Sequence, residues 1–270
     1  MSEPERVTIT IEDGVADVRL NRPEKRNALD QAMFSALVEA SDRLAADRSV
    51  RAVVLSGEGK SFCAGLDMSS FQAMASGGPR RERDLPTPPP GRKTNPGQQA
   101  AYGWTELPVP VIAAVHGHAL GGGLQIALAC DLRVVAPDAQ LSVLEIRWGL
   151  VPDMTGTFML RRLVPLDVAK ELTWTGRMVS GTEAVALGLA TMVSDDPRAT
   201  ALDLARTLAT KNPHAIRASK RLLNQSGLVD EAQQYRDEAT EMRALIGSPN
   251  QAEAVRAELE RRAPVFVDPD

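Results

Sequence analysis

The chain has 270 residues, of which 43% are hydrophobic and 4% aromatic, and its formal net charge at pH 7 is −4. This length allows one large domain or two smaller ones, with a core built mainly from aliphatic side chains. The acidic balance argues against a general nucleic-acid-binding surface. No stretch reaches about 18 uninterrupted apolar residues, so we expect neither a membrane span nor a membrane partner.

The N-terminus and the cysteines indicate where the protein works. Residues 1–6 contain no apolar signal core, and Cys63 and Cys130 lie far apart in apolar surroundings. Buried free thiols of this kind are typical of a reducing compartment, so we expect a cytoplasmic protein without disulfides. None of the histidines has zinc-ligand spacing with a cysteine, and no metal site is expected.

The first elements in the chain follow from hydrophobic periodicity. Residues 7–11 and 15–20 alternate apolar with polar side chains around a Glu-Asp-Gly turn, which predicts a hairpin. An apolar stripe at helical spacing follows, formed by Met33, Leu37, Ala40 and Leu44. Residues 51–56 contain the apolar run 52–55 between Arg51 and Ser56 and predict a buried strand.

The next stretch, 76–98, is rich in glycine and proline. This composition cannot hold a helix or a central strand. Long irregular loops are usually functional or disordered. We expect a flexible loop here, and the alternative is that it forms the rim of a binding pocket.

The second half of the chain alternates strands and helices. Strand, helix and strand are predicted at 110–115, 121–130 and 131–135, and this alternation indicates an α/β fold. From Asp196 onward the pattern is helical, with helices predicted over 230–246 and 250–262.

Two turns made of small residues each follow a predicted core strand. One contains Ala64 and Gly65, and the other contains three consecutive glycines from Gly121. Glycine in a helix costs about 1 kcal/mol relative to alanine, but it leaves the unpaired amides of a helix start open to a ligand. Two such turns can direct two N–H groups at one carbonyl oxygen, as in an oxyanion hole. The alternative is close helix packing.

Five motifs in family order resemble the crotonase family, the enoyl-CoA hydratase/isomerase superfamily. They are Leu20-Asn21-Arg22-Pro23 with residues 25–29, then 62–67, 119–123, 130–133, and Glu145 with 149–152. They span about residues 6–226, nearly the whole chain. The resemblance implies a spiral of ββα units over 1–195, and a helical region over 196–270 that forms homotrimers or hexamers. It also implies an acyl-CoA thioester substrate and no separate cofactor, because coenzyme A is part of that substrate.

The resemblance assigns the binding residues by motif position. The oxyanion-hole donors it implies are the backbone amides of Leu66 and Gly122. Its implied substrate and coenzyme A contacts are Arg26, Ala28, Ala64, Gly65, Asp67 and Met68. Lys220 or Arg221 of a neighbouring subunit is a further candidate for contacting the nucleotide.

The acid/base residues distinguish one reaction of this family from another. Hydratases of the family use two glutamates, and the matching positions here are Gln125 and Glu145. A carboxamide exchanges no proton at neutral pH, so Gln125 leaves the hydratase pair incomplete and is a polar pocket residue. The neighbours of Glu145 are apolar, and desolvation is expected to raise its pKa toward that of a general base. The alternative is a structural ion pair with Arg147 or Arg161.

Asp153 matches the aspartate of the family's dienoyl-CoA isomerases, although the third acid of that pattern is missing. Two carboxylates beside an acyl chain can take a proton from one carbon and return one to another. The alternative role for Asp153 is the N-cap of a helix beginning near Met154. We therefore predict an enoyl-CoA isomerase with Glu145 and Asp153 as catalytic residues. The alternatives are an enoyl-CoA hydratase and a non-catalytic acyl-CoA-binding protein.

Overall fold

The computed structural model describes residues 5–76 and 87–269. Its strands are β1 (Val7–Glu12), β2 (Val15–Leu20), β3 (Ala52–Gly57), β4 (Val111–Val115), β5 (His118–Leu120), β6 (Leu132–Val135), β7 (Gln140–Ser142), β8 (Val179–Ser180) and β9 (Met192–Val193). Its α-helices are α1 (Gln31–Ala46), α2 (Met68–Ala75), α3 (Pro96–Glu106), α4 (Gly122–Ala129), α5 (Gly156–Leu163), α6 (Leu166–Thr175), α7 (Gly181–Leu187), α8 (Pro197–Ala209), α9 (Pro213–Gln225), α10 (Glu231–Leu245) and α11 (Pro249–Glu260). Short 3-10 helices are η1 (Pro23–Lys25) and η2 (Leu144–Trp148). No helix in the described part of the chain combines the length and apolarity needed to cross a membrane.

The main sheet has the strand order β1-β2-β3-β4-β6-β9. β1 and β2 pair antiparallel, which confirms the predicted hairpin, and the later neighbours in this sheet pair parallel. A smaller sheet has the order β5-β7-β8. A bridge between Cys63 and Ala119 ties the segment after β3 to β5. The α/β class expected from the sequence is confirmed.

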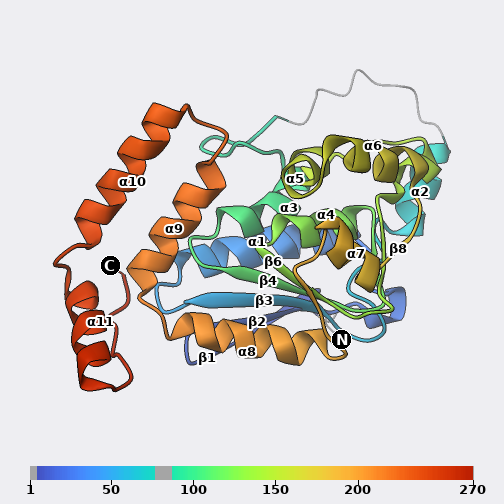
Figure 1. Ribbon diagram of the computed structural model, residues 1–270. Coiled ribbons are helices and arrows are strands. Elements are labelled where there is room, and N and C mark those ends of the chain that lie inside the picture. Colours follow the sequence, from blue (N-terminus) through green and yellow to red (C-terminus); the bar gives the residue numbers. More distant parts are fainter. Residues whose placement is uncertain (1–4, 77–86, 270) are drawn as a thin grey trace.

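Helices cover the main sheet on both faces (Figure 1). In β3, Val53 and Leu55 pack into the large core beneath α1, α3 and α4. Ala52 and Val54 point the other way, toward α8. A parallel strand buried on both faces needs an unbroken apolar run, which explains why residues 52–55 are all apolar. The predicted stripe of α1 is also confirmed, because its four apolar residues all lie in the large core.

α3 occupies part of the stretch that was expected to be irregular. It begins at Pro96 because Asn95 and Gln98 form a capping box and proline is tolerated in the first helical turn. Its Trp104 is fully buried in the large core. The prediction that 76–98 holds no helix is therefore wrong at its C-terminal end. Residues 77–86, the middle of the expected flexible loop, lie outside the described residues.

The C-terminal helices divide into two groups. α8 lies against β2, β3, β4 and β6, and covers the far face of the main sheet. The residues it buries there are small: Ala201, Ala205 and Ala209. α10 and α11 instead project from the main body (Figure 1), and α10 buries no residue. The division into 1–195 and 196–270 stays a prediction, with α8 packed on the sheet of the first part.

Candidate active site

The loop after β3 is anchored by Asn27, whose side chain is fully buried. Its Oδ1 accepts a hydrogen bond of 2.8 Å from the backbone N–H of Arg22. Its Nδ2 donates to three carbonyl oxygens of the loop, those of Glu58, Ser61 and Phe62, at 3.0, 2.8 and 3.1 Å. The motif analysis gave Asn27 no role of its own, and the structure makes it the link between the two loops of the candidate site.

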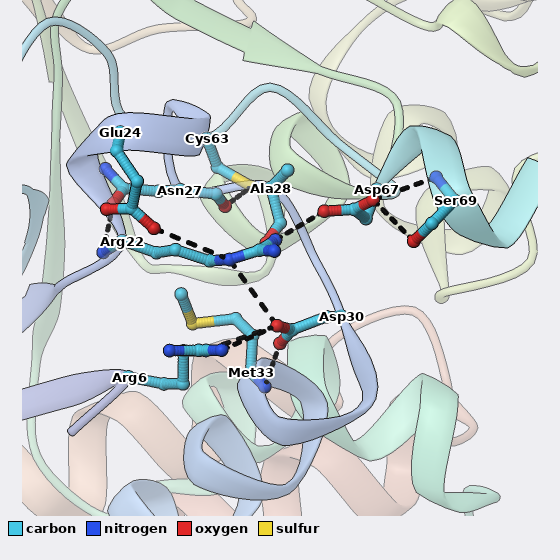
Figure 2. A network of polar contacts seen from close by, with 10 residues as sticks. All are labelled: Arg6, Arg22, Glu24, Asn27, Ala28, Asp30, Met33, Cys63, Asp67 and Ser69. Atoms are coloured by element: carbon cyan, nitrogen blue, oxygen red, sulfur yellow. Dashed lines mark hydrogen bonds and ion pairs between the residues drawn. The ribbon is translucent and has the colours of Figure 1, made fainter. Parts of the chain in front are cut away.

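Arg22 is ion-paired with three carboxylates in the same region, those of Glu24, Asp30 and Asp67 (Figure 2). Its Nη1 donates to Oδ2 of Asp67 at 2.5 Å and to the carbonyl oxygen of Ala28 at 3.1 Å. Asp67 also caps α2 by accepting from the backbone N–H of Ser69 at 2.9 Å. Hydrogen bonds from Ser69 and Arg22 hold the pKa of Asp67 well below its usual range. The carboxylate of Asp67 is thus committed within the protein, while its predicted contact with coenzyme A stays a prediction.

The remaining residues predicted to contact coenzyme A lie on the same pair of loops. The backbone N–H of Ala64 donates to the carbonyl oxygen of Arg26 at 2.9 Å. One step along, Leu29 donates its N–H to the carbonyl oxygen of Gly65 at 2.8 Å. The structure therefore brings the two predicted binding segments together in a short parallel pairing, with Met68 54% exposed at the start of α2.

The two small-residue turns lie directly against each other. Gly65 has φ +86°, and a β-carbon there would lie 2.6 Å from the carbonyl oxygen of Leu120 and 3.9 Å from the nitrogen of Gly122. Both the backbone conformation and the close approach require glycine. Neither Leu66 nor Gly122 donates its N–H to a protein acceptor within residues 5–76 and 87–269. Two unpaired amides thus lie on adjoining turns, one of them at the start of α4, and their action on one small acceptor stays a prediction.

Glu145 lies on the other side of the glycine turn. A β-carbon at Gly121 would lie 3.3 Å from its Oε1. Gln125 donates from Nε2 to the same Oε1 at 2.6 Å. The Oε1 of Gln125 accepts from the backbone N–H groups of Met154 and Gly156 at 2.8 and 2.9 Å. Because both backbone groups are donors, they orient the carboxamide so that its NH₂ group faces Glu145.

The second carboxylate oxygen of Glu145 is available for chemistry. Oε2 is buried and has no hydrogen-bond partner in the part of the chain that is described. Burial raises the pKa of Glu145, the hydrogen bond from Gln125 opposes this rise, and the charge of Asp153 adds to it. No ion pair joins Glu145 to Arg147 or Arg161 among these residues, so that alternative is wrong. A buried, unpaired carboxylate oxygen is what a general base requires.

Asp153 has a different environment from the one that its motif suggested. Its side chain is exposed, in the turn before α5. The N-cap position of α5 is Thr155, with φ 68°, so the N-cap interpretation of Asp153 is wrong because the helix begins later than expected. The observed effect of Asp153 on Glu145 is that its negative charge helps to raise the pKa of Glu145. Its role as a second catalytic carboxylate stays a prediction.

Lys220 does not reach outward from the C-terminal helices. Its buried Nζ donates to the carbonyl oxygen of Val109 at 2.8 Å and to Asp131 at 2.7 Å. The suggestion that Lys220 contacts the nucleotide of a neighbouring subunit is therefore wrong, because this side chain holds α9 against the core. Arg221 is exposed and hydrogen-bonded to Glu241, and its contact with a neighbour stays a prediction.

An aromatic contact connects the two halves of the site and was missed by the sequence analysis. The rings of Phe71 on α2 and Trp148 on η2 stack with centroids 4.2 Å apart and an interplanar angle of 19°. Met74 on α2 and Leu150, two residues after the end of η2, are 56% and 42% exposed. Exposed apolar side chains beside the paired turns provide a surface for an apolar group.

Cys63 and Cys130 are buried and free, as expected, and burial raises the pKa of each thiol to about 12. Among residues 5–76 and 87–269, no group of three or more His, Cys, Asp or Glu side chains is placed to hold a metal ion.

Known proteins are similar to this chain in sequence and in fold. The family model described as enoyl-CoA hydratase/isomerase matches residues 10–269. The mitochondrial enoyl-CoA hydratase domain-containing protein 2 of Bos taurus is 37% identical over 265 residues, covering 94% of this chain and 84% of that protein. The (E)-benzylidenesuccinyl-CoA hydratase of Thauera aromatica is 34% identical over 274 residues, covering 96% and 98%. The crystal structure of an enoyl-CoA hydratase from Polaromonas sp. JS666 is similar with a TM-score of 0.86 at 30% identity, covering 97% of this chain and 99% of that chain.

Proposed function

Because this chain belongs to the enoyl-CoA hydratase/isomerase family, we propose that it moves a double bond within the acyl group of an enoyl-CoA thioester. Its fold is that of the crotonase-type enoyl-CoA hydratases. An acyl-CoA thioester is the substrate class that fits the family. The proposal concerns which of the family's reactions takes place and which residues perform it.

The proposed reaction starts from a 3-enoyl-CoA. Oε2 of Glu145 removes a proton from C2, and the electron pair of that C–H bond moves toward the thioester carbonyl, giving a dienolate. The N–H groups of Leu66 and Gly122 donate hydrogen bonds to the oxygen that gains the charge. One such donor is typically worth about 3 kcal/mol of barrier. Glu145 then returns the proton to C4, which leaves the double bond between C2 and C3 and restores the carboxylate.

The observation that supports this proposal is the pairing of Gln125 with Glu145. Adding water requires a proton to leave water while another reaches the α-carbon, and two carboxyl groups divide that work. Here one of the two positions holds Gln125, whose carboxamide is hydrogen-bonded to two backbone N–H groups and to Glu145. One carboxylate is sufficient for a 1,3-proton shift. For a dienoyl-CoA, where the proton travels further, Asp153 is the proposed second carrier.

Hydration of a 2-enoyl-CoA is the second candidate, and the names of similar proteins favour it. Incubation with 3-hexenoyl-CoA, 3,5-octadienoyl-CoA and crotonyl-CoA separates the two. We expect the absorbance of a 2-enoyl thioester to appear from 3-hexenoyl-CoA, with little loss of the crotonyl absorbance. Rapid loss of the crotonyl absorbance at the same enzyme concentration overturns the preference for isomerisation.

Glu145→Gln tests the assigned base and the non-catalytic alternative together. We expect this variant to keep its affinity for acetyl-CoA, a thioester without a double bond, and to lose turnover of 3-hexenoyl-CoA. A wild-type protein that binds acetyl-CoA but turns over none of the three unsaturated thioesters indicates a binding protein. Binding is measured by calorimetry, so this result does not depend on turnover.

Assembly into a homotrimer or hexamer through the C-terminal helices is also part of the proposal. α10, α11 and the junction between them expose large apolar and aromatic side chains: Tyr235 (63%), Met242 (58%), Ile246 (68%) and Leu259 (80%). Exposed apolar surface of this kind favours association. Light scattering of the purified protein is expected to give a multiple of three chains, and a monomer contradicts this part of the proposal.

A further inference from the structure

A second hollow lies at the opposite end of the main sheet from the glycine turns. It is a cavity of about 670 Å³ between the end of α1, α9, the α10–α11 junction and the C-terminal segment. Arg48 and Pro108 on its wall precede β3 and β4, whereas the two glycine turns follow these strands. Figure 1 shows the end of the chain returning beside α11 and α9. This hollow, called the C-terminal cavity below, is separate from the candidate active site.

Positive charge exceeds negative charge on the wall of the C-terminal cavity. The arginines and carboxylates that line it are Arg48, Arg217, Arg221, Glu241 and Asp268. Glu241 is already engaged, because it accepts three hydrogen bonds of 2.7–2.9 Å from Arg221. Asp268 accepts from Arg51, outside the cavity, at 2.6 Å. Arg48 and Arg217 are left without a carboxylate partner in the part of the chain that the structure describes.

Arg217 is the more informative of the two cations because it is only 8% exposed. Its Nη2 donates to the carbonyl oxygens of Val50 and Arg48 at 3.2 and 3.5 Å, which holds the guanidinium in place. Its Nε is buried and has no hydrogen-bond partner among the described residues. Burial, followed by the charge of Arg48, lowers the pKa of Arg217, while the charge of Asp268 opposes this shift. A buried guanidinium beside a second cation is stabilised when a further anion is bound there.

The rest of the wall is largely apolar, and it includes Ala45, Pro108, Ala244, Leu245 and Val267. His214 is also on the wall, and its Nδ1 is engaged with the Asn250 side chain at 3.0 Å. Small-molecule sites usually measure roughly 300–1,000 Å³ and combine apolar walls with a few placed polar groups. An oxyanion suits the planar donors of arginine. We propose that the C-terminal cavity binds a small amphipathic anion, whose carboxylate or phosphate contacts Arg217 and Arg48 and whose apolar part lies against the aliphatic wall.

Calorimetric titration of the full-length protein tests the site with three probes of equal chain length. Octanoate and octyl phosphate carry the anion, and octanamide is the neutral match for octanoate. We expect both anions to bind and to raise the melting temperature, with octanamide about tenfold weaker. The stronger of the two anions identifies the preferred head group. Equal affinity for octanoate and octanamide, or no binding of either anion, overturns the proposal.

Three arginine variants test whether octanoate binds in the C-terminal cavity. Arg48→Gln removes an exposed charge and is expected to weaken octanoate binding about fivefold, the loss of one partly exposed charge contact. Arg217→Lys keeps the charge but not the planar donors, and is also expected to weaken binding. Arg43→Gln changes an exposed arginine of α1 that is not on the wall, and should leave affinity unchanged. The proposal fails if Arg48→Gln and Arg217→Lys both bind octanoate like wild type, or if Arg43→Gln loses as much.

The binding test of the C-terminal cavity does not depend on the proposed isomerase reaction. Arg48 lies at the end of the sheet away from Leu66, Gly122 and Glu145, so Arg48→Gln is expected to turn over 3-hexenoyl-CoA at the wild-type rate. Loss of octanoate binding with unchanged turnover supports the anion site. A wild-type protein inactive on every thioester that still binds octanoate through Arg48 supports the anion site while removing the proposed reaction.

Discussion

The carboxamide of Gln125 donates one hydrogen bond of 2.6 Å to the carboxylate of Glu145. The same carboxamide accepts from the backbone N–H groups of Met154 and Gly156. The turn before α5, Gln125 and Glu145 thus form one connected unit, in which one carboxylate oxygen is bonded and the other has no partner within 5–76 and 87–269. The pKa of Glu145, the proposed base, can therefore be changed by substituting Gln125 or Asp153 while Glu145 itself is kept.

The pH dependence of turnover is expected to respond to both neighbours of Glu145, in opposite directions. The base acts only when ionised, so kcat/KM for 3-hexenoyl-CoA should rise with pH through the pKa of Glu145. Gln125→Leu removes a hydrogen bond that lowers this pKa and should move the rise to higher pH. Asp153→Asn removes a charge that raises it and should move the rise to lower pH. Rate profiles between about pH 5 and 9 check this, and shifts in the same direction contradict it.

Replacing the base is expected to stabilise the protein while inactivating it. Burial raises the pKa of Glu145 above its ordinary value of 4.5, so the unfolded chain loses its proton at a lower pH than the folded one. Stability therefore falls as the pH rises from the unfolded to the folded pKa, and the cost is fully present above both. At about pH 7, Glu145→Gln should gain about 0.5–2 kcal/mol in unfolding free energy and lose about a thousandfold in kcat.

Urea unfolding of Glu145→Gln at two pH values checks the sign. The gain in stability should shrink below the ordinary glutamate pKa of 4.5, where both states of the wild type are protonated. Glu12→Gln, at an exposed glutamate on β1, is the matched control and should change neither stability nor rate. A Glu145→Gln protein less stable than wild type at about pH 7 contradicts the assignment of desolvation as the dominant cause.

Alanine variants of two glycines with nearly the same backbone conformation distinguish the cost of backbone strain from the loss of the active-site arrangement. Gly65 and Gly91 have φ +86° and +80°, so alanine at either should cost about 1–2 kcal/mol in stability. At Gly65 the new β-carbon would also lie 2.6 Å from the carbonyl oxygen of Leu120, whereas at Gly91 nothing lies within 4 Å. Gly65→Ala should displace the N–H of Leu66 and lower kcat by about 100- to 1,000-fold.

Gly91→Ala should keep the wild-type kcat, so the comparison uses kcat and unfolding free energy for both variants. If Gly65→Ala turns over at the wild-type rate, the turn of Gly65 is not part of the catalytic arrangement.

Two neighbouring residues of α9 are expected to differ sharply in their contribution to stability. Lys220 is paired with Asp131 in a buried contact, with the side chains 8% and 23% exposed. Lys220→Met leaves Asp131 without this partner and should cost about 3 kcal/mol. Arg221→Met breaks an exposed pair with Glu241 and should cost about 1 kcal/mol or less. Urea unfolding measures both, and equal losses contradict the different burial of the two pairs.

Much of the core was predictable because periodicity reports burial directly. The alternation in β1 and β2, the stripe of α1 and the apolar run of β3 each match a distinct burial pattern. The start of α3 was missed because 76–98 was treated as one glycine- and proline-rich stretch. Asn95 with Gln98 was the signal that identifies this helix start, since the two form a capping box.

The candidate site was predictable only in part. The motifs located both turns, Gln125 and Glu145, because glycine and acid positions can be read along the chain. They did not show which group the carboxamide would bond, because its backbone donors lie 29 and 31 residues away in sequence. The same distance in sequence hid the burial of Lys220 against Asp131, 89 residues apart.

The α/β class, the hairpin and the two glycine turns were predictable from the sequence alone. Each depends on side-chain periodicity or on backbone freedom within a short segment. The orientation of Gln125, the free oxygen of Glu145 and the charge balance of the C-terminal cavity came from the folded chain alone. Burial and hydrogen bonding depend on which distant segments pack together. They determine the proton affinity of a carboxylate, and in the described part of the chain they leave Arg217 hydrogen-bonded to carbonyl oxygens but to no carboxylate.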